Sequence, residues 1–172
     1  NVLTAFFQVM SASTTAGFNT VNIGKLSTTS LAVLIAAMVI GASPSGTGGG
    51  IKSTSISVLL GIVGSVMRGQ FKQITFLNKA IPLNRVFTAV ASTTTYMFTL
   101  IIIVYLLTLT EHFSFMELCF EAASALGTVG LSMGITADLT NLGKIILSLA
   151  MFLGRVGPLS NQIQTLLPVK VI

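Results

Sequence analysis

The chain has 172 residues, of which 52% are hydrophobic and only 8% are charged, and its mean hydropathy is +0.92. An ordinary soluble domain carries about 25% charged residues, so the composition excludes a soluble globular domain and indicates a membrane protein. The net charge of +5 does not indicate nucleic-acid binding, because four of the nine cations fall within residues 68–85 and all four acids fall within residues 111–138.

Residues 1–20 are predicted to form a short helix followed by a glycine-containing turn. The turn holds Thr15, Ala16, Gly17 and Phe18. A ring of backbone carbonyls can replace the hydration shell of K⁺ if successive C=O groups turn inward, and glycine permits the backbone angles that this requires. The turn is therefore a candidate ion filter, and a plain loop between two helices is the alternative interpretation.

Two uncharged runs, Leu26–Ile51 and Val86–Thr110, are each long enough to cross a hydrocarbon core of about 30 Å, and two membrane spans are expected from them. The first run continues to Met67 with Lys52 as its only charge, and as one helix it would extend about 63 Å. That length is about twice the hydrocarbon core, so a break is predicted within it. We expect helices over 27–41 and 53–67 with a flexible loop between them.

The break falls in the stretch GASPSGTGGGIKST, residues 41–54. A phosphate-binding loop needs glycine directly before its lysine, and Ile51 stands there instead, so the stretch does not match a nucleotide-binding motif. Irregular backbone at membrane depth is tolerated only beside a cavity. A loop over 42–52 that swings aside below a filter is the interpretation that its Pro44, Gly46, Thr47, Gly48, Gly49 and Gly50 favour.

Residues 68–85 hold four cations and no acid, namely Arg68, Lys72, Lys79 and Arg85. Lys and Arg concentrate in short cytoplasmic loops, so this segment is predicted to be a cytoplasmic linker. The helix expected over 86–110 then crosses to an external segment at 111–117. His112 is expected to be an exposed loop residue there.

Residues 114–133 are predicted to hold a second short helix and turn. Ser114 and Glu117 form a capping box, so a helix should begin near Phe115 and run to about Leu126. Twelve residues give about 18 Å, half a bilayer, and the carboxyl end of such a helix favours a cation at the midplane. The turn that follows holds Thr128, Val129, Gly130 and Leu131.

Residues 139–172 are predicted to form an inner helix, which Gly157 and Pro158 would break. Arg155 lies within this helix, and charges at such depth usually face a pore or a partner. A structural arginine that caps the carbonyls of a broken helix is the alternative.

The two ends of the chain align at an offset of 113 residues. Matches include Phe7 with Phe120, Ser11 with Ser124, Thr15 with Thr128, Gly17 with Gly130 and Gly41 with Gly154. This period suits a duplicated multi-helix membrane module, whose first copy lacks a counterpart of residues 86–110, so we expect the chain to be a fragment of a longer protein. Glu121 aligns with Gln8 and is expected to be hydrogen-bonded behind the turn. With one His and one Cys, Cys119, which is expected to be buried, neither a catalytic triad nor a metal site can be assembled, and the chain is predicted not to be an enzyme.

Three motifs resemble the carboxyl-terminal half of the Trk/Ktr/HKT superfamily of K⁺ transport proteins, and most closely its KtrB branch: Ser13–Thr20, Gly41–Thr54 and Met151–Ser160. The resemblance implies an all-α membrane protein with two helix–pore-loop–helix repeats of a four-repeat, pseudo-fourfold channel-like fold. Residues 1–67 would be the third repeat without its opening helix, with pore helix and filter over 1–20 and a broken inner helix over 27–67. Residues 86–172 would be the fourth repeat.

The resemblance also implies roles for individual residues. Gly17 and Gly130 match the filter glycines associated with K⁺ selectivity, and the other filter backbone would come from Thr15, Ala16, Phe18, Thr128, Val129 and Leu131. Glycines of the 42–52 loop match the intramembrane gate, and Arg155 matches an arginine that acts beside it as an electrostatic barrier to cations.

The implied function is K⁺ translocation across the plasma membrane by the multi-pass, pore-forming subunit of a Ktr-type uptake system, without a covalent cofactor and with Na⁺ as an activating ion in many members. The implied partners are the missing N-terminal repeats, a second copy in a homodimer, a cytosolic nucleotide-binding KtrA-like ring and the lipid bilayer. The alternatives are a Trk- or HKT-type symporter with strict ion coupling, another secondary transporter with a broken-helix site, and an intramembrane enzyme.

Overall fold

The computed structural model of the chain describes residues 2–41, 48–69, 74–76 and 79–156. These residues are mainly helical, as expected. Their α-helices are α1 (Val2–Ser13), α2 (Thr28–Val39), α3 (Ser53–Met67), α4 (Leu83–Thr110), α5 (Phe115–Leu126) and α6 (Asn141–Val156). Two 3-10 turns, η1 (Ile23–Lys25) and η2 (Ile135–Asp138), and a small antiparallel hairpin of β1 (Thr75–Phe76) and β2 (Lys79–Ala80) complete them.

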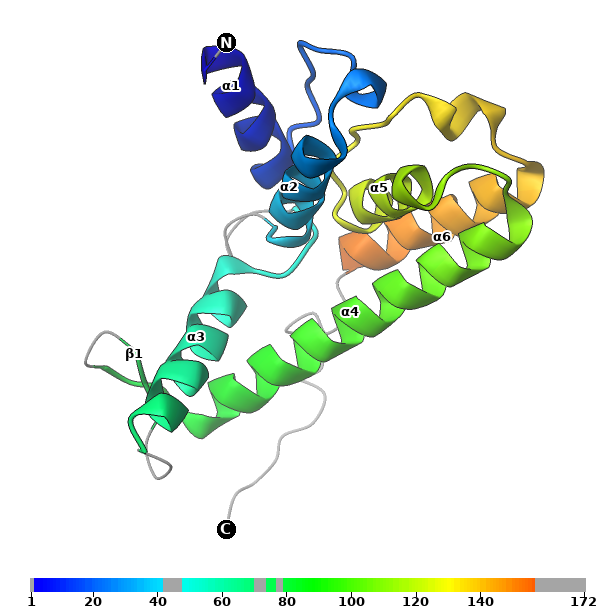
Figure 1. The fold of residues 1–172 in the computed structure, drawn as a ribbon. Coiled ribbons are helices and arrows are strands. Elements are labelled where there is room, and N and C mark those ends of the chain that lie inside the picture. The colour runs from blue at the N-terminus through cyan, green and yellow to red at the C-terminus, as the bar shows by residue number, and fades with distance from the viewer. Residues whose placement is uncertain (1, 42–47, 70–73, 77–78, 157–172) are drawn as a thin grey trace.

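Three helices, α3, α5 and α6, lie along the long helix α4, and α1 and α2 lie farther from it (Figure 1). α3 packs against the first part of α4, and α5 and α6 pack against its last part. α1 and α2 lie together, and α2 also contacts α5. α5 therefore stands between α2 on one side and α4 and α6 on the other.

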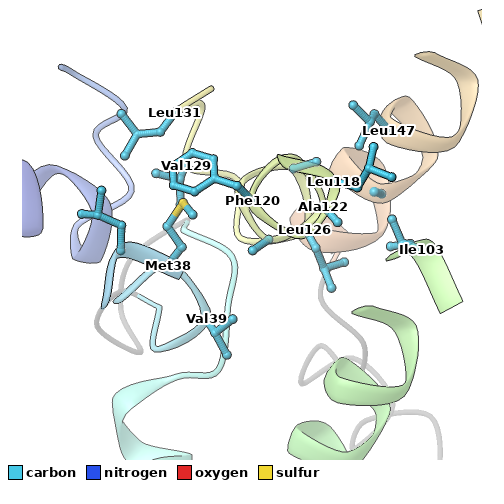
Figure 2. Close-up of a cluster of buried hydrophobic side chains, with 14 of the residues drawn as sticks. Met38, Val39, Ile103, Leu118, Phe120, Ala122, Leu126, Val129, Leu131 and Leu147 are labelled. Atoms are coloured by element: carbon cyan, nitrogen blue, oxygen red, sulfur yellow. The ribbon is translucent and has the colours of Figure 1, made fainter. Parts of the chain in front are cut away.

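The main hydrophobic core surrounds α5, of which eight of twelve residues are buried. Figure 2 shows Phe120 of α5 pointing toward Met38 of α2 and toward Val129. Leu118 and Leu126 point to the opposite side, where Leu147 of α6 and Ile103 of α4 lie. Because large apolar side chains leave α5 in both directions, this short helix is fixed from two sides.

α1 aligns with α5 in sequence but is far less covered. Only three of its twelve residues are buried, Gln8, Ser11 and Ala12. Its exposed apolar side chains include Val2, Leu3, Phe6, Phe7 and Met10. The buried face of α1 is therefore the face that lies against the turn after this helix. The other faces of α1 are exposed in the described structure.

The helix expected after Ser114 is present as α5, and its capping box is formed. The Ser114 N–H donates to the Glu117 carboxylate at 2.9 Å, and the Glu117 N–H donates to the Ser114 hydroxyl at 3.4 Å. α4 begins at Leu83, directly after Pro82, which is earlier than the expected start at residue 86. Proline is tolerated at the start of a helix because the first N–H groups have no partner within the helix.

The uncharged run Leu26–Ile51 does not form a continuous membrane span, so the expectation of two such spans is wrong for this run. α2 ends at Val39, and the chain enters α3 only at Ser53. With 12 and 15 residues, the two pieces extend about 18 Å and about 22 Å, less than the hydrocarbon core. Among the described residues, only α4 is long and apolar enough to cross a membrane by its length and composition.

The two ends of the break meet each other. The Ile51 N–H donates to the Val39 carbonyl at 2.9 Å. A Cβ placed on Gly41 would overlap the Gly49 carbonyl oxygen, and one placed on Gly50 would lie 2.7 Å from the Gly41 Cα. The chain directly after α2 and the chain directly before α3 therefore lie in contact. Residues 42–47 of the loop between them lie outside the described part.

The segment 68–85 contains a hairpin that the sequence patterns did not predict. Its Thr75 N–H donates to the buried Ser65 hydroxyl of α3 at 3.0 Å. Phe76 and Ile81 lie against Gly61, where a Cβ would be 3.2 Å from each side chain. The absence of a side chain at Gly61 thus lets the hairpin approach α3 closely.

α6 begins at Asn141 rather than at residue 139, because Leu139 is extended. The described part of this helix ends at Val156. Gly157, Pro158 and the rest of the predicted inner helix to residue 172 lie outside the described residues.

Candidate ion filter

The two predicted filter turns have the same unusual backbone. Thr15 and Thr128 have φ angles of 56° and 55°, and they are the only non-glycine residues with positive φ in the described part of the chain. Gly17 and Gly130 follow with φ angles of 75° and 88°. A left-handed threonine is uncommon, and such strain concentrates at functional positions.

Ala16 and Val129, between these left-handed residues, do not have positive φ. In an extended strand, successive carbonyl groups point to opposite sides of the chain. Alternation between left-handed and ordinary backbone departs from this pattern and allows successive carbonyls to turn toward the same side. This is the arrangement that a carbonyl filter requires.

The same hydrogen bonds end both short helices. The Ala16 N–H donates to the Ser11 carbonyl at 3.0 Å, and the Val129 N–H donates to the Ser124 carbonyl at 2.9 Å. The Thr128 N–H likewise donates to Ala125 at 3.1 Å. The inner end of each turn is therefore anchored to the helix before it.

The two turns lie next to each other. A Cβ placed on Gly17 would overlap the Val129 carbonyl oxygen and would lie 3.6 Å from the Gly130 Cα. Apart from its chain neighbours, no described residue has an atom within 4 Å of a Cβ placed on Gly130. The predicted filter residues of the two ends of the chain are thus brought together, and Gly17 is the residue at which they are closest packed.

Gln8 and Glu121 support the turns from behind, as expected for Glu121. Both side chains are buried, with exposed fractions of 4% and 5%. The Gln8 amide oxygen accepts a hydrogen bond from the Thr20 N–H at 3.4 Å, and the Glu121 carboxylate accepts one from the Met133 N–H at 3.0 Å. Thr20 and Met133 are also 113 residues apart, so Gln8 and Glu121 accept hydrogen bonds from backbone N–H groups at aligned positions.

The Glu121 carboxylate has two further donors. The Ser132 hydroxyl donates to it at 2.6 Å, and the Thr136 hydroxyl donates to it at 2.9 Å. The two hydroxyl oxygens are themselves 2.9 Å apart. A buried carboxylate with three donors is satisfied without a cation beside it.

The Phe18 carbonyl is held by α1. The Ser11 hydroxyl donates to it at 2.6 Å, and the Gln8 amide N–H donates to it at 3.5 Å. The Phe18 side chain is 70% exposed, whereas its aligned residue Leu131 is buried. The carbonyl oxygen of Phe18 therefore faces α1, the helix that precedes the turn.

The end of the glycine loop touches the second turn. The Gly49 N–H donates to the Thr128 hydroxyl at 2.8 Å, and a Cβ on Gly49 would lie 2.9 Å from the carbonyl oxygens of Leu126 and Gly127. A Cβ placed on Gly154 of α6 would overlap the same Leu126 oxygen. Three parts of the chain thus meet at the carboxyl end of α5.

Arg155 follows Gly154 and is exposed on the last turn of α6. The structure therefore places it one residue from the junction between loop and short helix. Gly48, Gly49 and Gly50 are described, but Gly46 and Thr47, also expected in the gate, lie outside the described residues.

Glu111 is a buried residue that the sequence analysis did not single out. Its carboxylate accepts from the Thr140 N–H at 3.1 Å and from the Thr140 hydroxyl, and it lies against Gly143. The Thr140 hydroxyl in turn accepts from the Gly143 N–H at 3.2 Å. A negative charge is thus held at the start of α6, where the helix dipole favours it. No local pattern marks this contact, because its partners are 29 residues apart.

Two minor expectations have different outcomes. His112 is exposed, as expected. Cys119 is only half-buried on α5, whereas a small buried side chain was expected. Its neighbours Leu118 and Phe120 point into the core instead.

The chain matches known transport proteins over nearly all of its length. A family model named TrkH and described as "Cation transport protein" matches residues 1–169. Ktr system potassium uptake protein B of Bacillus subtilis (strain 168) is 36% identical over 156 residues, which are 91% of this chain and 35% of that protein. Protein D of the Ktr system in the same organism is 39% identical over 151 residues, 87% of this chain and 33% of that protein.

The fold also matches a solved structure. The crystal structure of the potassium transporter TrkH from Vibrio parahaemolyticus superposes with a TM-score of 0.75 at 23% identity, covering 96% of this chain and 37% of that one. The chain thus spans about a third of the length of these relatives. The relatives are named as uptake proteins and a transporter, in agreement with the prediction that the chain is not an enzyme.

Proposed function

Because this chain belongs to the TrkH family of cation transport proteins, which are membrane proteins, we propose that it is part of the pore-forming subunit of a Ktr-type potassium uptake system. The observation that carries the proposal is the pair of left-handed Thr–Gly turns at aligned positions, which lie side by side. The Ktr relatives support potassium as the ion.

The proposed filter consists of the backbone of Thr15, Ala16, Gly17 and Phe18 together with that of Thr128, Val129, Gly130 and Leu131. Carbonyl oxygens turned to one side can replace the water around a dehydrated K⁺ ion. The Phe18 carbonyl is drawn toward α1 by Ser11 and Gln8, so its backbone would end the filter rather than add a free oxygen to it. No side-chain charge is required at the ion.

The proposed gate consists of Gly48, Gly49 and Gly50 at the end of the loop and Arg155 on α6. The hydrogen bond from Gly49 to Thr128 supports this gate, since it joins the end of the loop to the first residue of the second proposed filter turn. Arg155 follows Gly154, which packs against the carboxyl end of α5. The charge of Arg155 would therefore lie near the path of an ion that leaves the proposed filter. A cation would meet electrostatic repulsion there.

We further propose that the parent protein is a multi-pass protein of the plasma membrane whose other repeats complete the pore. The uncovered apolar face of α1 supports this, since the aligned helix α5 is buried on both sides. Residues 68–85 would lie in the cytoplasm, and Glu111 would lie at the external end of α4. A homodimer, a KtrA-like nucleotide-binding ring at the basic segment and activation by Na⁺ belong to the same proposal.

The experiment that tests the proposal uses the full-length parent protein in liposomes. Its K⁺ flux is measured against increasing Na⁺, for the parent and for Gly17→Ser. We expect selective K⁺ flux in the parent and weaker discrimination against Na⁺ in the variant. An unchanged K⁺/Na⁺ ratio would argue against the filter. Flux that is strictly coupled to a second ion would instead favour the symporter.

A further inference from the structure

Gln8 and Glu121 do more than fill space behind the two turns. Each binds the backbone N–H of the residue three positions after a filter glycine, Thr20 after Gly17 and Met133 after Gly130. The inner end of each turn is bound separately, through the N–H of Ala16 or Val129. Each glycine therefore stands between two anchored backbone groups. The outer anchor is Glu121 after Gly130, and it is Gln8 together with the Ser11 hydroxyl after Gly17.

We propose that Gln8 and Glu121 are positioning residues that set ion selectivity by fixing the outer end of each filter strand through the hydrogen bonds of one buried side chain. Both side chains accept from the backbone, and Gln8 also donates to the Phe18 carbonyl. This inference rests on the proposed filter function. Both side chains are almost completely buried. If the acceptor oxygen is removed, water has little access to replace it, and the Thr20 or Met133 N–H loses its partner on the helix.

The two positions differ in the hydrogen bonds that they require. Gln8 needs a donor as well as an acceptor, because its amide N–H faces the Phe18 carbonyl. A carboxylate at position 8 would place an oxygen against that carbonyl oxygen, with no proton between them. Gln8→Glu is nearly isosteric, so its effect would come from this electrostatic conflict.

Position 121 tolerates either chemistry. A glutamine amide oxygen there can accept from the Met133 N–H and from the Ser132 hydroxyl, as the carboxylate does. Its amide N–H can donate to the Thr136 hydroxyl, which can then donate to the Ser132 oxygen 2.9 Å away. Glu121→Gln thus keeps every hydrogen bond and removes only the charge, whereas Glu121→Leu removes all acceptors at similar size.

The test measures the K⁺/Na⁺ flux ratio of the full-length parent protein in liposomes at matched protein content. We expect Glu121→Gln to stay within about twofold of the parent and both Glu121→Leu and Gln8→Glu to lower the ratio by about tenfold. A residue with a purely structural role would change the amount of folded protein but not this ratio. The result specific to a positioning role is a K⁺/Na⁺ ratio that is retained in Glu121→Gln and lowered in Gln8→Glu.

Gly130→Ser, measured alongside, separates this inference from the function on which it rests. If Gly130→Ser lowers the ratio but Glu121→Leu and Gln8→Glu do not, the positioning role is overturned and the filter stands. If Glu121→Gln lowers the ratio as much as Glu121→Leu, charge acts rather than the acceptor, and the inference is wrong. If Gly130→Ser has no effect, both fall. Should Glu121→Leu not fold, an unchanged ratio in Gln8→Glu alone overturns the inference.

Discussion

The backbone N–H of Gly49 donates a hydrogen bond of 2.8 Å to the hydroxyl of Thr128, across 79 residues of sequence. The loop between α2 and α3 is thereby joined to the second turn of the proposed filter. In the described residues, the aligned Thr15 hydroxyl makes no such bond to the loop. The two threonines of the proposed filter have aligned sequence positions and the same backbone, but among the described residues only Thr128 has a hydrogen bond to the loop.

This asymmetry predicts different effects for the same substitution at the two threonines. Thr128→Val removes the acceptor and leaves the Gly49 N–H without its partner, which should release the loop and raise K⁺ flux severalfold in the full-length protein. Thr15→Val is the matched control, since it removes the aligned hydroxyl, which has no hydrogen bond to the described loop residues 48–52. Initial rates of K⁺ uptake into liposomes measure both. Equal changes in the two variants would show that the loop contact does not restrain flux.

The contact between Gly154 and the end of α5 predicts a loss of stability on a small substitution. In Gly154→Ala the new methyl group would overlap the Leu126 carbonyl oxygen, so α6 has to move away from α5. Overpacking of this kind typically costs about 1–3 kcal/mol. Gly64→Ala in α3 is the control, because no described residue outside its own helix backbone has an atom within 4 Å of the new Cβ.

Thermal unfolding of the detergent-solubilised full-length protein compares the two variants. We expect a lower midpoint for Gly154→Ala and an unchanged or higher one for Gly64→Ala, since alanine favours a helix over glycine. If the two midpoints move together, the close approach of α6 to α5 is not what the structure describes.

Glu111 predicts a second stability effect, at the other end of α6. Glu111→Ala leaves the Thr140 N–H and hydroxyl without their acceptor and removes a negative charge from a helix N-terminus. Hydrogen bonds to charged groups contribute about 1.5–3 kcal/mol, so a loss of that order is expected in the free energy of unfolding. His112→Ala, which changes the exposed neighbour, should have no comparable effect. Denaturant or thermal unfolding would distinguish them, and equal stabilities of both variants would contradict the capping role.

The sequence predicted those parts of the fold that local chemistry determines. The capping box of Ser114 and Glu117 marks α5, and the proline and glycines after Gly41 mark the break between α2 and α3. A count of uncharged residues failed for Leu26–Ile51, because it measures apolar length and not helix continuity. The hairpin after α3 also escaped prediction, since its strands have only two residues each.

The candidate site was predictable in its residues but not in its contacts. The offset of 113 residues identified Gly17 and Gly130 and paired Gln8 with Glu121. The bonds of Gly49 to Thr128 and of Glu111 to Thr140 join residues 79 and 29 positions apart. Such contacts follow from how the helices pack, and no local pattern encodes them.

The central claim is that the paired Thr–Gly turns present backbone oxygens to a dehydrated K⁺ ion, and Gly130 allows the most direct test. Its surroundings leave room for a side chain, but its φ of 88° is unfavourable for any residue with a Cβ. Serine at this position should therefore shift the backbone without a steric clash. In the full-length protein, K⁺ flux measured in competition with Na⁺ should lose selectivity in Gly130→Ser, and a K⁺/Na⁺ ratio equal to that of the parent would contradict the claim.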